Sequence, residues 1–434
     1  MRKGFLIAAP ASGSGKTVLT LAILRALHKR GVMVQPAKAG PDFIDPAFHT
    51  AASGETCFNL DPWAMGRDRL LDLADNDGLL VVEGMMGLFD GAADGSGSAA
   101  DLAETLGLPI VLVVDCAKQS HSIAALVSGF VNHCPQLRFG GVILNRVGSA
   151  RHEALLRDAL APMELPILGC VFRDEKLATP SRHLGLVQAQ ERDGLEAFLD
   201  HAAAVAEAQI DLDGLAELKA SGTERSTYSS AGLPVLGQRI AVARDAAFSF
   251  IYPHWLRDWH NSGCELSFFS PLADEAPASD SEAVFLPGGY PELHGGQISE
   301  AHRFKSGLSL LAEAGVAIYG ECGGFMVLGQ GLLDADGENH AMAGLLPHAT
   351  SFAKRKLHLG YRNAMLQTSG VLGEVGSLFA AHEFHYSSLL EHDAAGCSAL
   401  FDCVDARGKA LGLLGLQRGR VAGSYLHLID RRPS

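Results

Sequence analysis

The stretch from Pro10 to Thr17, which reads Pro-Ala-Ser-Gly-Ser-Gly-Lys-Thr, is the first candidate for chemistry. An apolar run at residues 5–9 precedes it and a helical pattern follows it, so the loop should join a strand to a helix. Gly13 and Gly15 let backbone N–H groups converge on an anion, and the helix N-terminus adds partial positive charge. The stretch is therefore typical of a phosphate-binding loop, although Pro10 replaces its first glycine.

We predict that this loop binds the phosphates of ATP. Lys16 would reach the β- and γ-phosphates, and the Thr17 hydroxyl would bind Mg²⁺. Asn145 ends a strand predicted at 141–145, where its amide could pair with the adenine edge. The predicted ATP-binding residues are Gly13, Ser14, Gly15, Lys16, Thr17 and Asn145. The alternatives are an ordinary turn before a helix and, for Asn145, a polar loop residue.

A lysine and two carboxylates follow the second predicted strand, residues 32–37. Lys38 comes directly after it, and Asp42 and Asp45 lie in a loop that two prolines and a glycine stiffen. In a parallel sheet this loop lies at the same edge as the phosphate loop. We predict that Lys38, Asp42 and Asp45 contact the substrate; the alternative is a solvated turn.

Glu83 is the last residue of an apolar strand predicted at 79–83. In a phosphate-loop fold, a carboxylate at such a strand end points toward the Mg²⁺ that the loop threonine holds. The predicted metal ligands are therefore Thr17, Asp45 and Glu83. The alternative for Glu83 is an exposed residue that ends the strand.

The second candidate site is Gly320-Glu-Cys-Gly-Gly324, which follows a strand predicted at 316–319. A reactive residue between glycines at a sharp strand-to-helix turn is typical of a nucleophile elbow. We predict that Cys322 is a nucleophile whose thiol pKa the helix N-terminus lowers. The backbone N–H groups of Gly289 and Gly323 would form an oxyanion hole. The alternative is a buried structural cysteine.

A cysteine nucleophile requires a base to handle protons. Seven histidines follow Cys322. His427 is our first candidate because it comes late in the chain after a strand, in the Cys-then-His order of such sites. His385, in His-Glu-Phe-His-Tyr-Ser, is the second.

The surrounding sequence predicts an α/β protein. Apolar strands alternate with helical stretches, which favours parallel sheets covered on both faces. The 434 residues are enough for two or three domains. A polar, aperiodic segment at 219–238 is predicted to be a linker, which gives domains at 1–218 and 239–434.

Composition and charge argue against a nucleic-acid-binding, membrane-spanning or disulfide-rich protein. The net charge of −14 comes with no basic cluster, so we expect no nucleic-acid partner. No apolar run is long enough for a membrane span. The eight cysteines are scattered without a CxxC pair, which indicates reduced thiols. We expect a cytoplasmic protein with small-molecule partners.

Both candidate sites together resemble those of the cobyrinic acid a,c-diamide synthases, and most closely the branch that acts on cobalt-free hydrogenobyrinic acid. The resemblance covers nearly the whole chain. The motifs that carry it are Ala9-Pro-Ala-Ser-Gly-Ser-Gly-Lys-Thr17, Lys38-Ala-Gly-Pro-Asp-Phe-Ile-Asp45, Glu83-Gly-Met-Met-Gly-Leu-Phe-Asp-Gly91, Pro287-Gly-Gly-Tyr-Pro-Glu292, Gly320-Glu-Cys-Gly-Gly324, Leu359-Gly-Tyr-Arg362 and Ser424-Tyr-Leu-His427.

The resemblance implies two three-layer α/β/α domains. The first is akin to dethiobiotin synthetase and binds ATP, Mg²⁺ and the macrocycle; the second is a flavodoxin-like class I glutamine amidotransferase domain with Cys322 and His427 as its catalytic pair. It implies amidation of the a- and c-carboxylates through acyl phosphates, with ammonia passing between domains. The oligomeric state stays open, a homodimer included.

One position departs from the pattern that triad enzymes share. They usually carry a glutamate two residues after the histidine, where this chain has Ile429, and Asp430 is one residue further on. The third member of the site is therefore unassigned. The alternative functions are a cobyric acid synthase that amidates other side chains, a phosphate-loop ATPase switch with a non-catalytic cysteine domain, and a cysteine hydrolase or chaperone.

Overall fold

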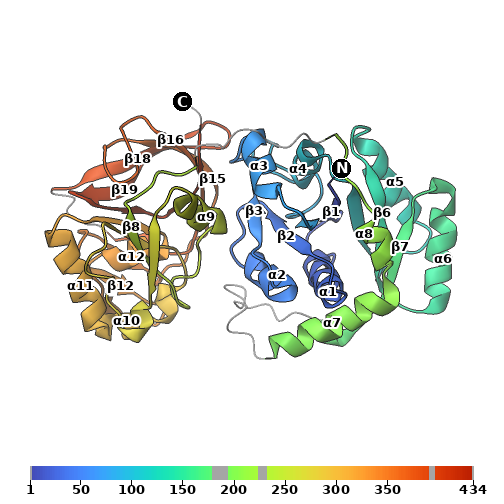
Figure 1. The fold of residues 1–434 in the computed structure, drawn as a ribbon, viewed down its shortest axis with the longest axis horizontal. Helices are drawn as coiled ribbons and strands as arrows, with labels where there is room; N and C mark the ends of the chain where they lie inside the picture. The colour runs from blue at the N-terminus through green and yellow to red at the C-terminus, as the bar shows by residue number, and fades with distance from the viewer. Residues whose placement is uncertain (1, 178–193, 223–231, 391–395, 433–434) are drawn as a thin grey trace. The chain divides into compact units, whose positions relative to one another are not determined.

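The computed structural model describes residues 2–177, 194–222, 232–390 and 396–432. The chain divides into two compact units, Met1–Ser230 and Ala231–Ser434, and each is built on its own large sheet (Figure 1). None of the helices in the described ranges combines the length and apolar character that a membrane crossing requires. All eight cysteines are free, as predicted.

The N-terminal unit contains a seven-stranded sheet in the order β3-β2-β4-β1-β5-β6-β7, and every pairing in it is parallel. The strands are β1 (Gly4–Ala8), β2 (Val34–Ala39), β3 (Phe58–Leu60), β4 (Leu79–Glu83), β5 (Ile110–Asp115), β6 (Phe139–Val147) and β7 (Ile167–Phe172). β1 and β4 are buried along their whole length, as continuous apolar runs predict for a sheet covered on both faces.

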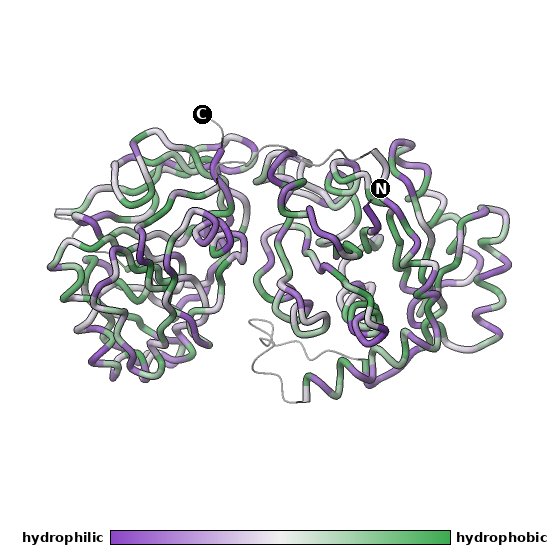
Figure 2. Tube along the Cα trace, in the orientation of Figure 1, coloured by the Kyte–Doolittle hydropathy of each residue, from purple (hydrophilic) through white to green (hydrophobic). Residues whose placement is uncertain are grey.

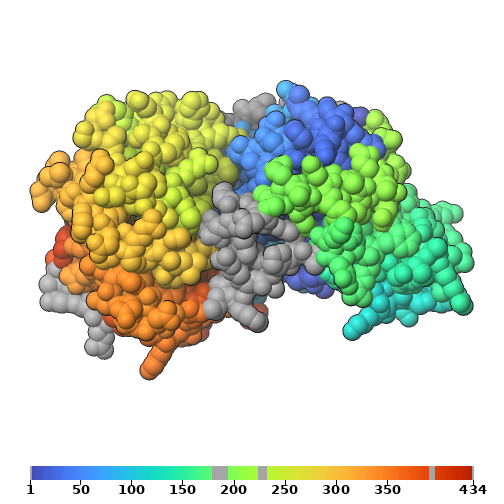
Figure 3. Space-filling view, turned by 90° about the horizontal axis from the view of Figure 1, so that it is seen from below, coloured from blue at the N-terminus to red at the C-terminus, as the bar shows by residue number. Residues whose placement is uncertain are grey.

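Helices cover both faces of this sheet. They are α1 (Lys16–Lys29), α2 (Asp45–Ser53), α3 (Arg67–Ala74), α4 (Ala99–Leu106), α5 (Ile123–His133), α6 (Ala150–Leu160), α7 (Leu195–Gln209) and α8 (Leu212–Ala216). α1 and α7 share one apolar core, and Figure 3 shows the light-green α7 region against the blue α1 region. α5 and α6 pack into a second core. The alanine- and glutamate-rich sequence at 188–208 predicts one helix; α7 covers its greater part, and residues 188–193 lie outside the described ranges.

The C-terminal unit contains a ten-stranded sheet in the order β21-β16-β15-β18-β19-β20-β11-β10-β8-β9. Its strands are β8 (Arg239–Ala243), β9 (Glu265–Phe269), β10 (Ala283–Leu286), β11 (Ala317–Glu321), β15 (His358–Leu366), β16 (Leu378–His385), β18 (Ser398–Asp405), β19 (Ala410–Arg418), β20 (Val421–Ser424) and β21 (Leu426–Arg431). The five strands from β20 to β9 are parallel, which confirms the predicted α/β core.

The other strands of this sheet are antiparallel, which the sequence did not lead us to expect. β20 and β21 lie at opposite ends of the six-strand half, yet only Tyr425 separates them in the chain. One residue spans about 3.8 Å, so these six strands must curve until their two ends meet. This curvature brings β21 back beside the parallel core.

Four helices and a small sheet complete the C-terminal unit. The helices are α9 (Pro253–Asn261), α10 (Gly295–Glu300), α11 (His302–Glu313) and α12 (Gly323–Leu328). The small sheet has the order β13-β12-β14-β17 and consists of β12 (Gly331–Leu333), β13 (Asn339–Ala341), β14 (Ala349–Ser351) and β17 (Ser388–Leu389). The sequence predicts one helix at 299–314; α11 accounts for most of it, and residues 299–300 form the end of α10.

The predicted linker at 219–238 is attached to the units at both of its ends. Lys219 bridges to Lys3 in the first unit, whereas Pro234 accepts a hydrogen bond from Trp259 in the second. Residues 223–231 lie outside the described ranges. The segment that could act as a connection is therefore shorter than the sequence indicated.

Apolar strands and amphipathic helices account for the core of each unit. Figure 2 shows hydrophobic colour along the central strands and alternating colour along the outer helices. In the second unit, Trp255, Trp259, Phe285 and Tyr319 form a stacked aromatic cluster against the parallel strands. This cluster packs directly beneath the strands that carry the second candidate site.

Helix α11 offers a matched test of this packing. Leu308 is 0% exposed and Leu310 is 66% exposed on the same helix. We expect Leu308→Ala to lower the free energy of unfolding by about 2–5 kcal/mol, because it leaves a cavity. Leu310→Ala should change it by less than about 0.5 kcal/mol. Urea titration followed by tryptophan fluorescence measures both, and equal effects would contradict the described packing.

Candidate functional site

The predicted phosphate loop lies between β1 and α1. Gly13 and Gly15 have φ values of 81° and 93°, a region that favours glycine. A Cβ on Gly15 would lie 2.2 Å from Asn145 Nδ2, so glycine is also required for this close approach. Lys16 begins α1, and its Nζ donates to the Met86 carbonyl. Burial lowers the pKa of Lys16.

The three predicted metal ligands converge, as their strand-end positions imply. The Thr17 hydroxyl lies 2.6 Å from Glu83 Oε1 and 3.5 Å from Asp45 Oδ2. A hydroxyl and two carboxylates form the hard oxygen donor set that Mg²⁺ prefers. These residues therefore fit a magnesium ion next to the phosphate loop.

Lys38 is buried among these carboxylates. Its Nζ lies 2.7 Å from Asp45 Oδ2, 3.1 Å from Glu83 Oε1 and 3.9 Å from Asp42 Oδ2. Burial alone would lower the pKa of Lys38, but the carboxylates, Asp45 first, outweigh it and raise that pKa. Lys38 thus supplies a fixed positive charge that lets the acidic groups lie close together. A direct contact with substrate stays a prediction.

Two other predicted site residues, Asp42 and Asn145, form hydrogen bonds with the backbone of the loops at this site. Asp42 Oδ1 accepts hydrogen bonds from the backbone N–H groups of Ile44 and Asp45, so it shapes the start of α2. Asn145 Nδ2 donates to the Ser14 carbonyl over 2.9 Å. Asn145 therefore braces the phosphate loop, and its adenine contact stays a prediction.

His49 belongs to this site, and the sequence analysis did not find it. Its Nε2 lies 2.6 Å from Glu83 Oε2, and both side chains are buried. Burial alone would raise the pKa of Glu83, but Lys38 and His49 hold it below its usual range. His49 lies four residues after Asp45 on α2, hence on the same helix face. That spacing was the signal available in the sequence.

The second candidate site is built on the turn between β11 and α12. Cys322 has φ 45° and ψ −102°, the strained backbone of a nucleophile elbow. Its N–H donates to the Ser424 carbonyl over 2.8 Å. A Cβ on Gly324 would lie 1.9 Å from the Leu286 carbonyl oxygen, so only glycine fits there. The elbow predicted from Gly320-Glu-Cys-Gly-Gly324 is present.

His427 lies beside the elbow. A Cβ on Gly288 would lie 2.3 Å from His427 Cε1 and 3.3 Å from Cys322 Cβ, so both side chains pack on the same glycine. Their proximity supports His427 as the base. Gly323 also packs near the predicted oxyanion donor, since a Cβ on it would lie 3.0 Å from Gly289 N. The four predicted residues of this site are thus neighbours.

The expected lowering of the Cys322 pKa is wrong for the structure as it stands. The side chain is 3% exposed, and burial raises the thiol pKa, with Glu292 and two further carboxylates adding to the effect. The short helix α12 does not outweigh this burial. Burial also lowers the pKa of His427 to about 3, with a contribution from His382. The site therefore pairs a neutral thiol with a neutral imidazole.

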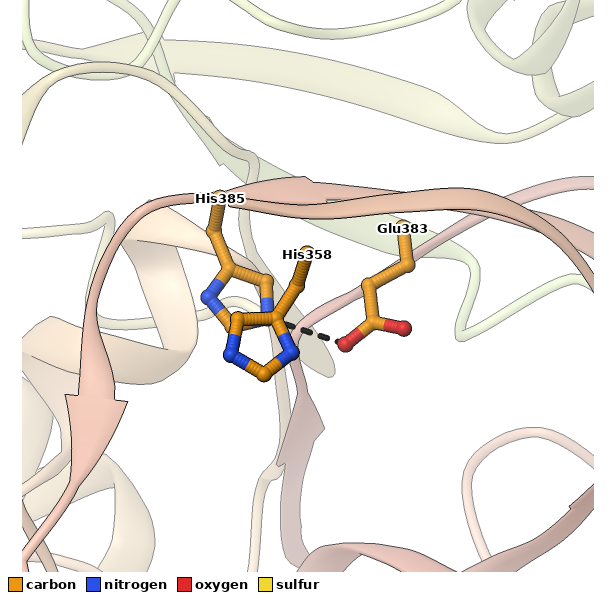
Figure 4. Close-up of side chains that lie close together, drawn as sticks. All are labelled: His358, Glu383 and His385. Carbon is orange, nitrogen blue, oxygen red and sulfur yellow. Dashed lines mark hydrogen bonds and ion pairs between the residues drawn. The ribbon is translucent and has the colours of Figure 1, made fainter. Parts of the chain in front are cut away.

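His385, the second candidate base, belongs to a different cluster. Its Nε2 lies 2.9 Å from Glu383 Oε1 (Figure 4). Its Nδ1 lies 2.9 Å from the Ser387 carbonyl oxygen. His358 stacks on the His385 ring at 4.6 Å, and Arg362 pairs with Glu383. Both ring nitrogens of His385 therefore have other partners, which favours His427 as the base.

Comparisons with known proteins agree with both sites. The family model for the CobQ/CobB/MinD/ParA nucleotide binding domain matches residues 5–187. The model for the CobB/CobQ-like glutamine amidotransferase domain matches residues 239–433. The first match contains the phosphate loop, and the second contains Cys322 and His427.

Several relatives that align over nearly the whole chain are named hydrogenobyrinate a,c-diamide synthase. The protein of that name from Brucella abortus biovar 1 is 56% identical over 99% of this chain and 98% of its own length. Those from Rhizobium meliloti and Mesorhizobium japonicum are 53% and 49% identical over 98% and 99% of this chain, and each is covered over 99% of its own length. With both domain models matched in order and relatives aligned from end to end, the chain belongs to the hydrogenobyrinate a,c-diamide synthase family.

Proposed function

We propose that this protein uses ATP and glutamine to amidate the a- and c-acetate carboxylates of hydrogenobyrinic acid or of its cobalt-containing counterpart. One observation carries the proposal: a single chain holds a phosphate loop with a carboxylate cluster and a strained cysteine beside a buried imidazole. The names of the whole-chain relatives supply the substrate. They favour this function over an ATPase switch or a cysteine hydrolase.

The first site would activate the acid. A carboxylate is a poor acceptor for an amine because its oxygen is a poor leaving group, so transfer of the ATP γ-phosphoryl group gives an acyl phosphate first. Backbone N–H groups of the loop and Lys16 would bind the phosphates and stabilise the transferring group. Thr17, Asp45 and Glu83 would hold Mg²⁺, which neutralises charge on the phosphates.

The second site would release ammonia. Cys322 Sγ attacks the side-chain amide carbon of glutamine while His427 accepts the thiol proton. The N–H groups of Gly289 and Gly323 would stabilise the oxyanion. His427 returns the proton to the departing nitrogen, which leaves as ammonia. The glutamyl group remains on Cys322 Sγ as a thioester, and water then hydrolyses it to glutamate and the free thiol.

The burial of Cys322 and His427 is consistent with these steps. A thiol with a raised pKa stays protonated between turnovers, so the proton moves only when glutamine is attacked. Ammonia must then reach the acyl phosphate unprotonated, since ammonium has no lone pair for attack. Displacement of phosphate forms the amide, and a second cycle amidates the other carboxylate.

A change at Cys322 should impair glutamine hydrolysis and leave the ATP-dependent site working. We expect Cys322→Ser to lower glutamine-dependent amidation by about 10³-fold or more, and to leave amidation from ammonium salts near the wild-type rate. Cys397→Ser, at a half-buried cysteine of the same unit, is the control and should leave both rates unchanged. Assays with each nitrogen source measure the difference. Loss of both activities in Cys322→Ser would rule out separate sites.

Lys16 tests the role of ATP. We expect Lys16→Ala to lower amidation from either nitrogen source by about 10²–10³-fold, because the transferring phosphoryl group loses its charge partner. Lys29→Ala is the control, because Lys29 lies at the other end of α1 in an exposed ion pair with Asp200. It should leave the rate of amidation nearly unchanged. Steady-state rates measure both variants. A Lys16→Ala enzyme with wild-type amidation would exclude the phosphate loop from the reaction.

A further inference from the structure

The residue directly before the nucleophile carries a buried carboxylate. Glu321 is the last residue of β11 and is 2% exposed. Its Oε2 lies 3.9 Å from His427 Nδ1, and both side chains are enclosed. β11 ends at Glu321, and Cys322 begins the turn into α12, so the two side chains are held by different elements.

A second contact of Glu321 also bears on the position of His427. Glu321 Oε1 accepts a hydrogen bond from Leu428 N over 3.0 Å, and another from the Tyr319 hydroxyl over 3.2 Å. Leu428 directly follows His427 in β21. The same carboxylate therefore holds the backbone beside the histidine with one oxygen and faces the imidazole with the other.

The residues after His427 do not supply an equivalent group. Ile429 is apolar and buried, and it occupies the place where the resemblance would put a glutamate. The Asp430 carboxylate accepts a hydrogen bond from Arg431 N. Glu321, by contrast, is a carboxylate whose Oε2 faces His427 Nδ1 among the described residues.

We infer that Glu321 is the positioning residue that orients His427 in the glutamine-hydrolysing site, an inference that rests on the proposed roles of Cys322 and His427. A carboxylate facing Nδ1 selects the tautomer with its proton on Nδ1, which leaves the Nε2 lone pair for the Cys322 proton. The 3.9 Å separation exceeds a hydrogen bond, and such contacts tighten when substrate binds. Burial raises the pKa of Glu321 to about 8, and an imidazolium formed beside it during attack would favour the ionised carboxylate, so that each charge stabilises the other.

The experiment compares Glu321→Gln with wild type. The amide oxygen of glutamine can still accept the Leu428 hydrogen bond, whereas the charge is lost. We expect the kcat for glutamine hydrolysis to fall at least about tenfold, with the KM for glutamine within about twofold and ammonium-dependent amidation unchanged. Asp430→Asn removes a buried carboxylate from the same strand as His427 and should leave glutamine hydrolysis unchanged.

Two further variants separate this inference from the proposed function. Cys322→Ser and His427→Ala should both abolish glutamine hydrolysis; retained hydrolysis in either would contradict the proposed function itself. If both are inactive and Glu321→Gln keeps the wild-type kcat, only the positioning role is overturned.

A measurement on the wild-type enzyme keeps the inference testable if Glu321→Gln fails to fold. Nuclear magnetic resonance of protein with isotopically labelled histidine, assigned with His427→Gln, reports which ring nitrogen carries the proton. We expect the proton on Nδ1 of His427. A proton on Nε2 in the neutral imidazole would overturn the positioning role.

Discussion

The strained backbone at Cys322 is the constraint on which the second unit depends. A non-glycine residue with positive φ costs about 1–3 kcal/mol, so the surrounding structure must hold it. Three backbone hydrogen bonds do so: Cys322 N to Ser424 O, Gly324 N to Pro287 O, and Met326 N to Cys322 O. They tie the elbow to β20, to the loop after β10 and to its own helix. The curvature of the antiparallel half then brings His427 to the same point, because β21 starts one residue after β20.

The site of the first unit depends on ion pairs between charged side chains. Asp42, Asp45 and Glu83 could not lie together in a buried site without compensation, since like charges repel strongly where water is excluded. Lys38 provides that compensation through its ion pairs, and His49 contacts the other oxygen of Glu83. Backbone geometry therefore holds the second site together, whereas ion pairs hold the first.

The sequence alone predicted those parts of the fold and of the two sites whose geometry a local pattern determines. Gly13, Gly15 and Lys16 predicted the phosphate loop, and the glycines around Cys322 predicted the elbow, because each motif lies between a strand and a helix. Glu83 could be predicted to lie near Thr17, since parallel strands end at one edge. The antiparallel half of the second sheet could not be predicted, because the pairings β15–β18 and β16–β21, which order its hairpins, join segments farther apart in the chain.

Long-range contacts account for the rest of what the sequence missed. The raised pKa of Cys322 arises from burial by several elements, and the approach of Glu321 to His427 depends on how β11 and β21 are placed. Ile429 correctly signalled that the usual third residue is absent, but a linear pattern gave no reason to look just before the nucleophile. His49 was recognisable only once Asp45 was placed on a helix.

The most direct test of the account follows nitrogen from one site to the other. The enzyme is incubated with ATP, Mg²⁺, hydrogenobyrinic acid, glutamine labelled with heavy nitrogen in its side-chain amide, and unlabelled ammonium, and the product is analysed by mass spectrometry. The account predicts a diamide in which both new amides carry the label. A product with more than two new amides, or with nitrogen drawn mainly from ammonium, would contradict it.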